Sequence, residues 1–161
     1  MHPTIFLDFD GVINNDEYPI DQGPIRIYFD SRLIEKLNNI IRQSGAKLVI
    51  SSDWRRGRSI AELQDLLESY DCIGEVIDKT PELEDFHNQW VPITRLEEER
   101  IKEIRQWLRV NGWPMPWVAI DDLDLSDLTW FVQTDPRTGI TDNNVNVAVK
   151  MLTDPIRGKH D

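Results

Sequence analysis

The feature that most constrains the fold is an alternation of short apolar runs with longer segments of helical periodicity. Apolar runs at residues 4–9, 47–50 and 117–120 predict buried strands, and weaker runs at 72–77 and 128–133 predict two more. Strands that alternate with helices form βαβ units with right-handed crossovers. The pattern therefore predicts an α/β fold of the Rossmann-like type, with a mostly parallel sheet and helices on both faces.

Local capping signals place the helices between these strands. A helix with Asp30 or Ser31 as its N-cap should end before Gly45, and Ser59 with Glu62 should form the capping box of a second helix. The clearest helical stripe covers residues 97–110, and a last one covers 141–152. Residues 97–99 are three glutamates, which we expect in the solvated first turn of their helix, where its dipole favours anions.

The chain should form one domain. Residues 11–29 are rich in Gly, Pro, Asn and Asp and predict an irregular excursion, and residues 78–96 have no clear period. No linker separates two regions, so we expect a single domain over residues 1–161, with a frayed tail after about residue 152.

Composition excludes several function classes. The 161 residues include 29 Asp and Glu against 18 Lys and Arg, a net charge of −11, which argues against bulk nucleic-acid binding. The single cysteine, Cys72, can build neither an internal disulfide nor a cysteine-rich zinc site. No apolar run is long enough to cross a membrane. A cytoplasmic enzyme or binding module is expected; the sequence does not define its oligomeric state.

Acidic and hydroxyl side chains follow three of the predicted strands. Asp8 and Asp10 end the first, Ser51 ends the second, and Asp121 with Asp122 ends the fourth. In an open α/β sheet, ligands bind beyond the carboxyl ends of the strands. Each acid alone could simply cap a turn, but converging carboxylates would repel one another, and a hard cation such as Mg²⁺ relieves this.

These segments resemble the four motifs of the haloacid dehalogenase superfamily, in the family's order. LDFDGV is similar to motif I, KLVIS to motif II, and VAIDD to the acidic pair of motif IV. Arg100, at the start of RIKEIRQWL, is similar to the motif III cation, with Arg in place of the commoner Lys; Arg95 is its rival. SSDWR and TDPRTGIT resemble the small phosphatase-like domains also found in RNA repair proteins.

The resemblance implies a Mg²⁺-dependent phosphatase. Asp8 would attack phosphorus and form an aspartyl-phosphate, and Asp10 would act as general acid and then as general base. Ser51 would hydrogen-bond a phosphoryl oxygen and Arg100 would neutralise its charge. The implied Mg²⁺ ligands are Asp8, Asp10 through its backbone carbonyl, Asp121 and Asp122.

The implied enzyme has no room for a cap domain. The intervals between Asp10 and Ser51 and between Ser51 and Arg100 are too short for a large insertion. In capless members of the superfamily nothing closes over the substrate, so the resemblance implies an enzyme that acts on exposed phosphate groups. The substrate is therefore expected to be a phosphorylated small molecule, a nucleotide or a nucleic-acid end.

A basic island follows motif II. Residues 54–58 read WRRGR, three arginines within four positions of an acidic chain, just before the N-terminus of a helix, where the dipole disfavours cations. One interpretation is pairing with surface acids. The other assigns Ser52, Trp54 and above all Arg55 to the substrate, with Arg55 on a phosphate and Trp54 packed beneath it or stacked on a base.

Two other function classes remain. A phosphoacceptor signalling module also uses strand-end acids and Mg²⁺, but it places its acidic pair at the first strand, whereas this chain has it at the fourth. A catalytically inactive relative that only binds is disfavoured, because every expected motif position holds a competent residue.

Overall fold

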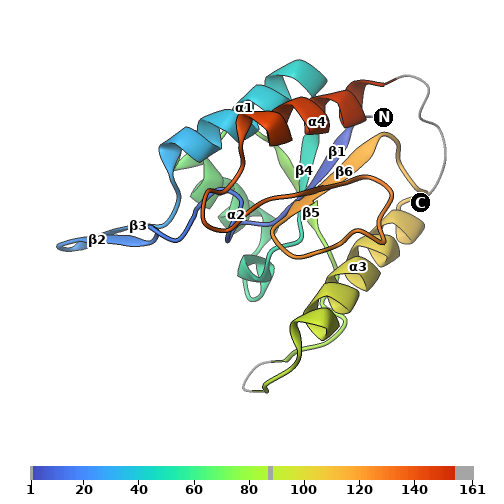
Figure 1. Ribbon diagram of the computed structural model, residues 1–161, viewed down its shortest axis with the longest axis horizontal. Coiled ribbons are helices and arrows are strands. Elements are labelled where there is room, and N and C mark those ends of the chain that lie inside the picture. Colours follow the sequence, from blue (N-terminus) through green and yellow to red (C-terminus); the bar gives the residue numbers. More distant parts are fainter. Residues whose placement is uncertain (1, 87–88, 155–161) are drawn as a thin grey trace.

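Five parallel strands form the central sheet of the computed structural model, which describes residues 2–86 and 89–154 (Figure 1). The strand order is β5-β4-β1-β6-β7, and every pair of neighbours is parallel. Their bounds are β1 Thr4–Leu7, β4 Lys47–Ile50, β5 Val76–Lys79, β6 Trp117–Asp121 and β7 Phe131–Gln133. The order places β1 at the centre, between the strands whose ends carry Ser51 and the acidic pair.

Helices cover both faces of this sheet. Their bounds are α1 Ser31–Ser44, α2 Ile60–Glu68, α3 Ile93–Val110 and α4 Asp142–Thr153. Apolar side chains of α1, α2 and α4 pack with Ile5 and Leu7 of β1 in one core cluster. Side chains of α3 pack with Phe6 in a second cluster on the opposite face. Successive β1 side chains therefore enter opposite cores, which explains why this strand is apolar throughout, and the expected α/β fold is confirmed.

Local signals located the helix ends wherever a side chain makes the cap. Asp30 caps α1 by accepting from Arg32 N, and α1 ends at Gly45, which adopts a left-handed conformation. Ser59 and Glu62 form the predicted capping box of α2. Strand β4 coincides with the expected range, 47–50.

Two segments between the elements differ from expectation. The run at 72–77 predicted a strand, but the strand, β5, begins only at Val76 and continues to Lys79. The excursion at 11–29 contains an antiparallel pair, β2 (Ile20–Gln22) and β3 (Ile25–Ile27). This hairpin projects away from the sheet, and most of its residues are exposed (Figure 1). Each of its strands is only three residues long, too short for a periodic pattern to reveal it.

The expected start of α3 was wrong by four residues. The helix begins at Ile93 with Pro92 as its N-cap, and no side chain caps it. The three glutamates at 97–99 therefore lie beyond the first turn, and Glu99 is buried rather than solvated. Burial is the largest cause of a raised pKa at Glu99, and the nearby Glu84 carboxyl adds to it.

The single cysteine, Cys72, is free and buried. Two expectations remain, one on membrane-spanning segments and one on the end of the chain. No helix in the described ranges combines the length and hydropathy of a membrane-spanning segment. Helix α4 continues to Thr153, one residue past the expected start of the frayed tail, and residues 155–161 of that predicted tail lie outside the described residues.

Candidate active site

The central strands bring the motif residues to one edge of the sheet. Asp8 follows β1, and its backbone N–H donates to the carbonyl of Ile120 in β6 at 3.1 Å. The N–H of Ser51, just after β4, donates to the carbonyl of Leu7 at 3.0 Å. Because parallel strands end at the same edge, β-ladder hydrogen bonds alone place Asp8 between Ser51 and the acidic pair of β6.

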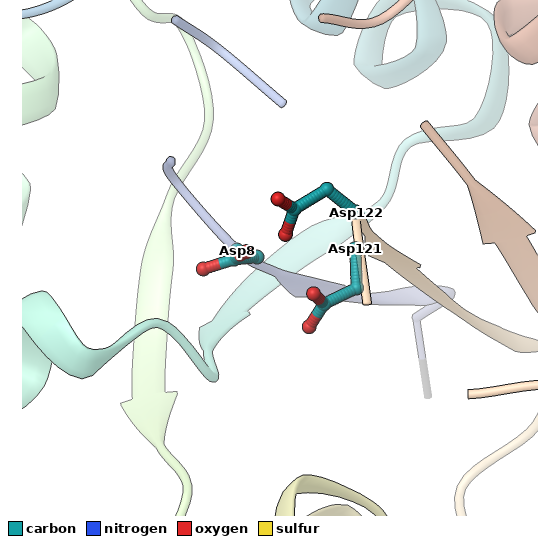
Figure 2. Close-up of side chains that lie close together, drawn as sticks. All are labelled: Asp8, Asp121 and Asp122. Atoms are coloured by element: carbon teal, nitrogen blue, oxygen red, sulfur yellow. The ribbon is translucent and has the colours of Figure 1, made fainter. Parts of the chain in front are cut away.

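Three carboxylates cluster at this edge (Figure 2). One oxygen of each of Asp8, Asp121 and Asp122 lies within 4.8 Å of the others. Asp8 and Asp121 are buried and Asp122 is half-buried. Burial, with the charge of Asp121, raises the pKa of Asp8 well above its ordinary value and that of Asp122 to about 6. The cluster holds more negative charge than its surroundings stabilise, as expected of a site that attracts a cation.

Arg100, from α3, is the cation that contacts this cluster. Its Nη1 lies 2.6 Å from Asp121 Oδ2 and 3.5 Å from Asp8 Oδ1. Burial alone would lower the pKa of Arg100, but the charges of Asp121 and Asp8 outweigh burial and raise it. The rival Arg95 pairs instead with Glu84 and lies over the ring of Phe86. Of the two rival arginines, Arg100 therefore contacts the clustered carboxylates, whereas Arg95 contacts surface groups.

Gly11 allows the close approach of Asp122. Gly11 has a φ of +78°, and a Cβ at this position would lie 2.6 Å from Asp122 Oδ2 and 2.8 Å from Asp122 Cβ. A side chain here would therefore displace Asp122 as well as strain the backbone. Thr134, which the sequence reasoning missed, holds this turn in place, since its hydroxyl donates to the Gly11 carbonyl at 2.7 Å.

Asp10 lies at the same edge, but its carboxylate is not part of the three-carboxylate cluster. Asn14 Nδ2 donates to its Oδ1 at 2.8 Å, and Trp54 Nε1 donates to its Oδ2 at 3.0 Å. Asn14 was also missed, although an amide four residues after an Asp in a Gly-containing turn is a usable signal. Asp10 therefore lines the same cavity as Asp8, as expected, but among the expected metal ligands only Asp8, Asp121 and Asp122 bring their carboxylates together.

The two serines after β4 differ in their roles. The Ser51 hydroxyl is buried and has no hydrogen-bond partner among the described residues. A buried hydroxyl without a partner is costly, so it marks a position where a ligand oxygen would be favoured. Ser52 instead uses its hydroxyl to cap the short 3-10 helix η1 (Asp53–Arg55), accepting from Trp54 N at 3.2 Å. Ser52 also lines the cavity described below.

The expectation that Arg55 binds substrate is wrong. Its side chain has 0% exposure, and its guanidinium pairs with Glu103 at 2.8 Å. The guanidinium also donates to four backbone carbonyls, those of Ser51, Ser52, Thr80 and Pro81. These bonds join the loop after β4 to the loop after β5, so Arg55 is a structural residue of the site.

The other members of the basic island divide between surface and site. Arg56 lines the cavity and pairs with Glu82 at 3.3 Å, as the surface-pairing interpretation expected. The guanidinium of Arg58 lies 5.2 Å from the centre of the Trp54 ring. Trp54 is thus covered by Arg58 on one side, and its indole N–H donates to Asp10.

A cavity of about 580 Å³ opens beside the carboxylates. Its lining includes Asp8, Asp10 and Arg100 together with apolar side chains of the segment leading into α3. Among these, Trp90 is 88% exposed. Sequence reasoning missed Trp90 because it lies in a segment without periodicity, where nothing predicts its position.

The residues at this edge fit a divalent cation. All the clustered donors are carboxylate oxygens, the ligands that Mg²⁺ prefers, and one guanidinium is the only cation that contacts them among the described residues. Because Gly11 has no Cβ, the turn leaves room for the Asp122 side chain close to Asp8 and Asp121.

The parallel sheet, with clustered aspartates and an arginine at its carboxyl edge, defines a haloacid dehalogenase-like α/β domain. A family described as the HAD domain in Swiss Army Knife RNA repair proteins matches residues 4–145. The chain belongs to this family. Such HAD domains are in general hydrolases of the phosphatase type. No solved structure matches the chain significantly.

Proposed function

We propose that the protein hydrolyses phosphate monoesters in a Mg²⁺-dependent reaction that passes through an aspartyl-phosphate on Asp8. One observation carries this proposal: the buried Asp8 carboxylate shares its site with Asp121, Asp122 and Arg100, beside the unpartnered hydroxyl of Ser51. A nucleophilic carboxylate, a cation and a free hydroxyl donor are the groups that a transferring phosphoryl group needs.

In the first half-reaction, an Asp8 carboxylate oxygen forms a bond to phosphorus while the bond from phosphorus to the ester oxygen breaks. Asp10 transfers its proton to the departing oxygen, which leaves as an alcohol. Arg100 and the Ser51 hydroxyl donate to phosphoryl oxygens as their charge develops.

In the second half-reaction, Asp10 is a carboxylate and accepts a proton from water as the water oxygen attacks phosphorus. The bond between phosphorus and Asp8 breaks, which releases inorganic phosphate and restores both aspartates. Mg²⁺ held by Asp8, Asp121, Asp122 and the backbone carbonyl of Asp10 would supply positive charge to the phosphoryl oxygens.

We further propose that the substrate is a nucleotide or the phosphorylated end of a nucleic acid. The family is described from RNA repair proteins. The cavity is much larger than a phosphate group, and the exposed ring of Trp90 offers a face for a base. The acidic lining, which includes Asp85 and Glu99, disfavours a long polyanion and favours a single terminal nucleotide.

The direct test is release of phosphate from 4-nitrophenyl phosphate with Mg²⁺, with a chelator, and by Asp8→Asn. We expect turnover only with the metal and only in proteins that retain Asp8. Asp65→Asn, at an exposed position on α2, is the matched control and should behave as wild type. Full activity after exhaustive chelation, or in Asp8→Asn, would contradict the proposal.

A second assay addresses the substrate. Nucleoside monophosphates and oligonucleotides with a 3′- or 5′-phosphate should be hydrolysed with a higher kcat/KM than glycerol phosphate. Preference for sugar phosphates or phosphopeptides would refute the proposed substrate class while leaving the phosphatase activity standing.

A further inference from the structure

The Asp10 carboxylate is fixed although its residue is exposed. A short carboxylate at a strand end would ordinarily sample several rotamers in water. Here each of its two oxygens accepts one hydrogen bond, from Asn14 Nδ2 at 2.8 Å and from Trp54 Nε1 at 3.0 Å. Both donors lie at the catalytic edge: Asn14 in the turn after β1, and Trp54 in η1 after β4.

Trp54 is itself rigidly held. Its ring packs edge-on against Tyr28 at 5.2 Å and Phe9 at 5.9 Å, and it tilts against Phe29 at 5.3 Å. The guanidinium of Arg58 lies over the ring. An indole with this many neighbours cannot rotate without disturbing the core, so its N–H points at Asp10 in a defined direction.

Asn14 is held by the turn that also contains Asp10. Its Oδ1 accepts from the backbone N–H of Gly11 at 2.8 Å, which leaves its Nδ2 free to donate to Asp10. The amide therefore links the Gly11 turn, against which Asp122 packs, to the carboxylate two residues after Asp8.

We propose that Trp54 and Asn14 are positioning residues that hold the Asp10 carboxylate for proton transfer and keep it apart from the carboxylate cluster. The inference rests on the proposed role of Asp10. An indole N–H only donates, and neither side chain titrates near neutral pH, so neither can take the proton that Asp10 transfers. Two neutral donors therefore orient Asp10 without the charge neutralisation that an arginine would cause.

The inference predicts a defect that depends on the leaving group. Trp54→Phe keeps an aromatic ring and removes the N–H. Asn14→Asp keeps the oxygen that accepts from Gly11 N–H and places a second negative charge beside Asp10. Each variant should lower kcat/KM about tenfold for glycerol phosphate, since a hydrogen bond to a charged group is worth at least this factor. Each should change kcat/KM for 4-nitrophenyl phosphate much less, because nitrophenolate leaves without protonation and kcat/KM reports only the first half-reaction, in which Asp10 is the acid.

Tyr28→Phe is the matched control, because it keeps the ring that packs on Trp54 and touches no atom of Asp10 in the known contacts. Relative to wild type, Tyr28→Phe should change kcat/KM by the same factor for both substrates. Melting temperatures of all variants separate misfolding from mispositioning, since partial unfolding lowers both activities equally.

Asp10→Asn separates the inference from the proposed function. If Asp10→Asn loses far more kcat/KM on glycerol phosphate than on 4-nitrophenyl phosphate and the two positioning variants do not, the positioning inference is wrong and the acid role of Asp10 stands. If Asp10→Asn lowers kcat/KM equally for both substrates, the acid role is wrong and the inference fails with it.

Discussion

Replacing Arg55 by methionine should lower the free energy of unfolding of the protein, and it should remove no contact with the substrate. Arg55→Met keeps an unbranched side chain of similar length but removes all donors. The Glu103 carboxylate, itself 2% exposed, would lose its partner at 2.8 Å and keep the backbone N–H of Leu83 at 3.2 Å. Four carbonyls would lose the guanidinium as well.

The magnitude follows from burial. Breaking a buried ion pair from one side costs about 3–5 kcal/mol, because the remaining charge is uncompensated. In a chain of this size, 1 kcal/mol shifts the melting temperature by about 2–4 °C, so Arg55→Met should melt roughly 6–20 °C lower than wild type. Burial moves the pKa of Arg55 down and that of Glu103 up, both toward the neutral form, so desolvation outweighs their attraction.

The assay is thermal unfolding of four proteins at neutral pH: wild type, Arg55→Met, Arg55→Met with Glu103→Leu, and Arg56→Met. Because apolar pairs often replace buried ion pairs without loss, the double variant should recover most of the lost stability. Arg56→Met removes a neighbouring surface pair and should change stability by about 1 kcal/mol or less. A melting temperature for Arg55→Met within about 2 °C of wild type would refute the buried-pair reasoning.

Three further predictions concern the site. Gly11→Ala should weaken the thermal stabilisation of the protein by Mg²⁺ severely, since its Cβ would displace Asp122, and unchanged stabilisation would contradict this. The pKa of Asp122 is raised to about 6, so its carboxylate becomes protonated as pH falls below about 6. Stabilisation by Mg²⁺, measured as the shift in melting temperature, should therefore be smaller at pH 5 than at pH 7.5. An equal shift at both pH values would count against Asp122 as a ligand. Trp90→Ala should raise KM for a nucleoside monophosphate and leave KM for glycerol phosphate unchanged, whereas Ile93→Ala, at a position that is also exposed but outside the cavity lining, should alter neither.

The same Asp122 shift affects metal-free stability with a definite sign. The folded pKa, about 6, exceeds the ordinary value of 3.8, so the folded protein binds the proton more tightly than the unfolded chain. The contribution of Asp122 to stability is therefore greatest below pH 3.8 and is lost as pH rises through about 6.

Sequence predicted the parts of the fold that local contacts determine. The box of Ser59 and Glu62 and the cap at Asp30 involve residues within three positions of each other, and both were found. The start of α3 was missed because Pro92 caps it without a side-chain hydrogen bond, so the chain carries no capping signal there.

The site divides in the same way. The sequence pattern predicts where the strands end, and parallel strands end at the same edge of a sheet. The residues that follow the strands could therefore be predicted to lie together. Arg55 is buried because it pairs with Glu103, which lies 48 positions away on another helix, and no local pattern indicates that pairing. The contact between Trp54 and Asp10 also joins loops that are distant in sequence.

The measurement that tests the account most directly is the mass of Asp8 during turnover. Wild-type protein is mixed with 4-nitrophenyl phosphate and Mg²⁺, quenched in acid within one turnover, and digested for peptide mass spectrometry. We expect one added phosphoryl group on Asp8 that disappears as substrate is consumed, and none in Asp8→Asn. Phosphate release without any phosphoryl group on Asp8, or a phosphoryl group there that persists without turnover, would contradict it.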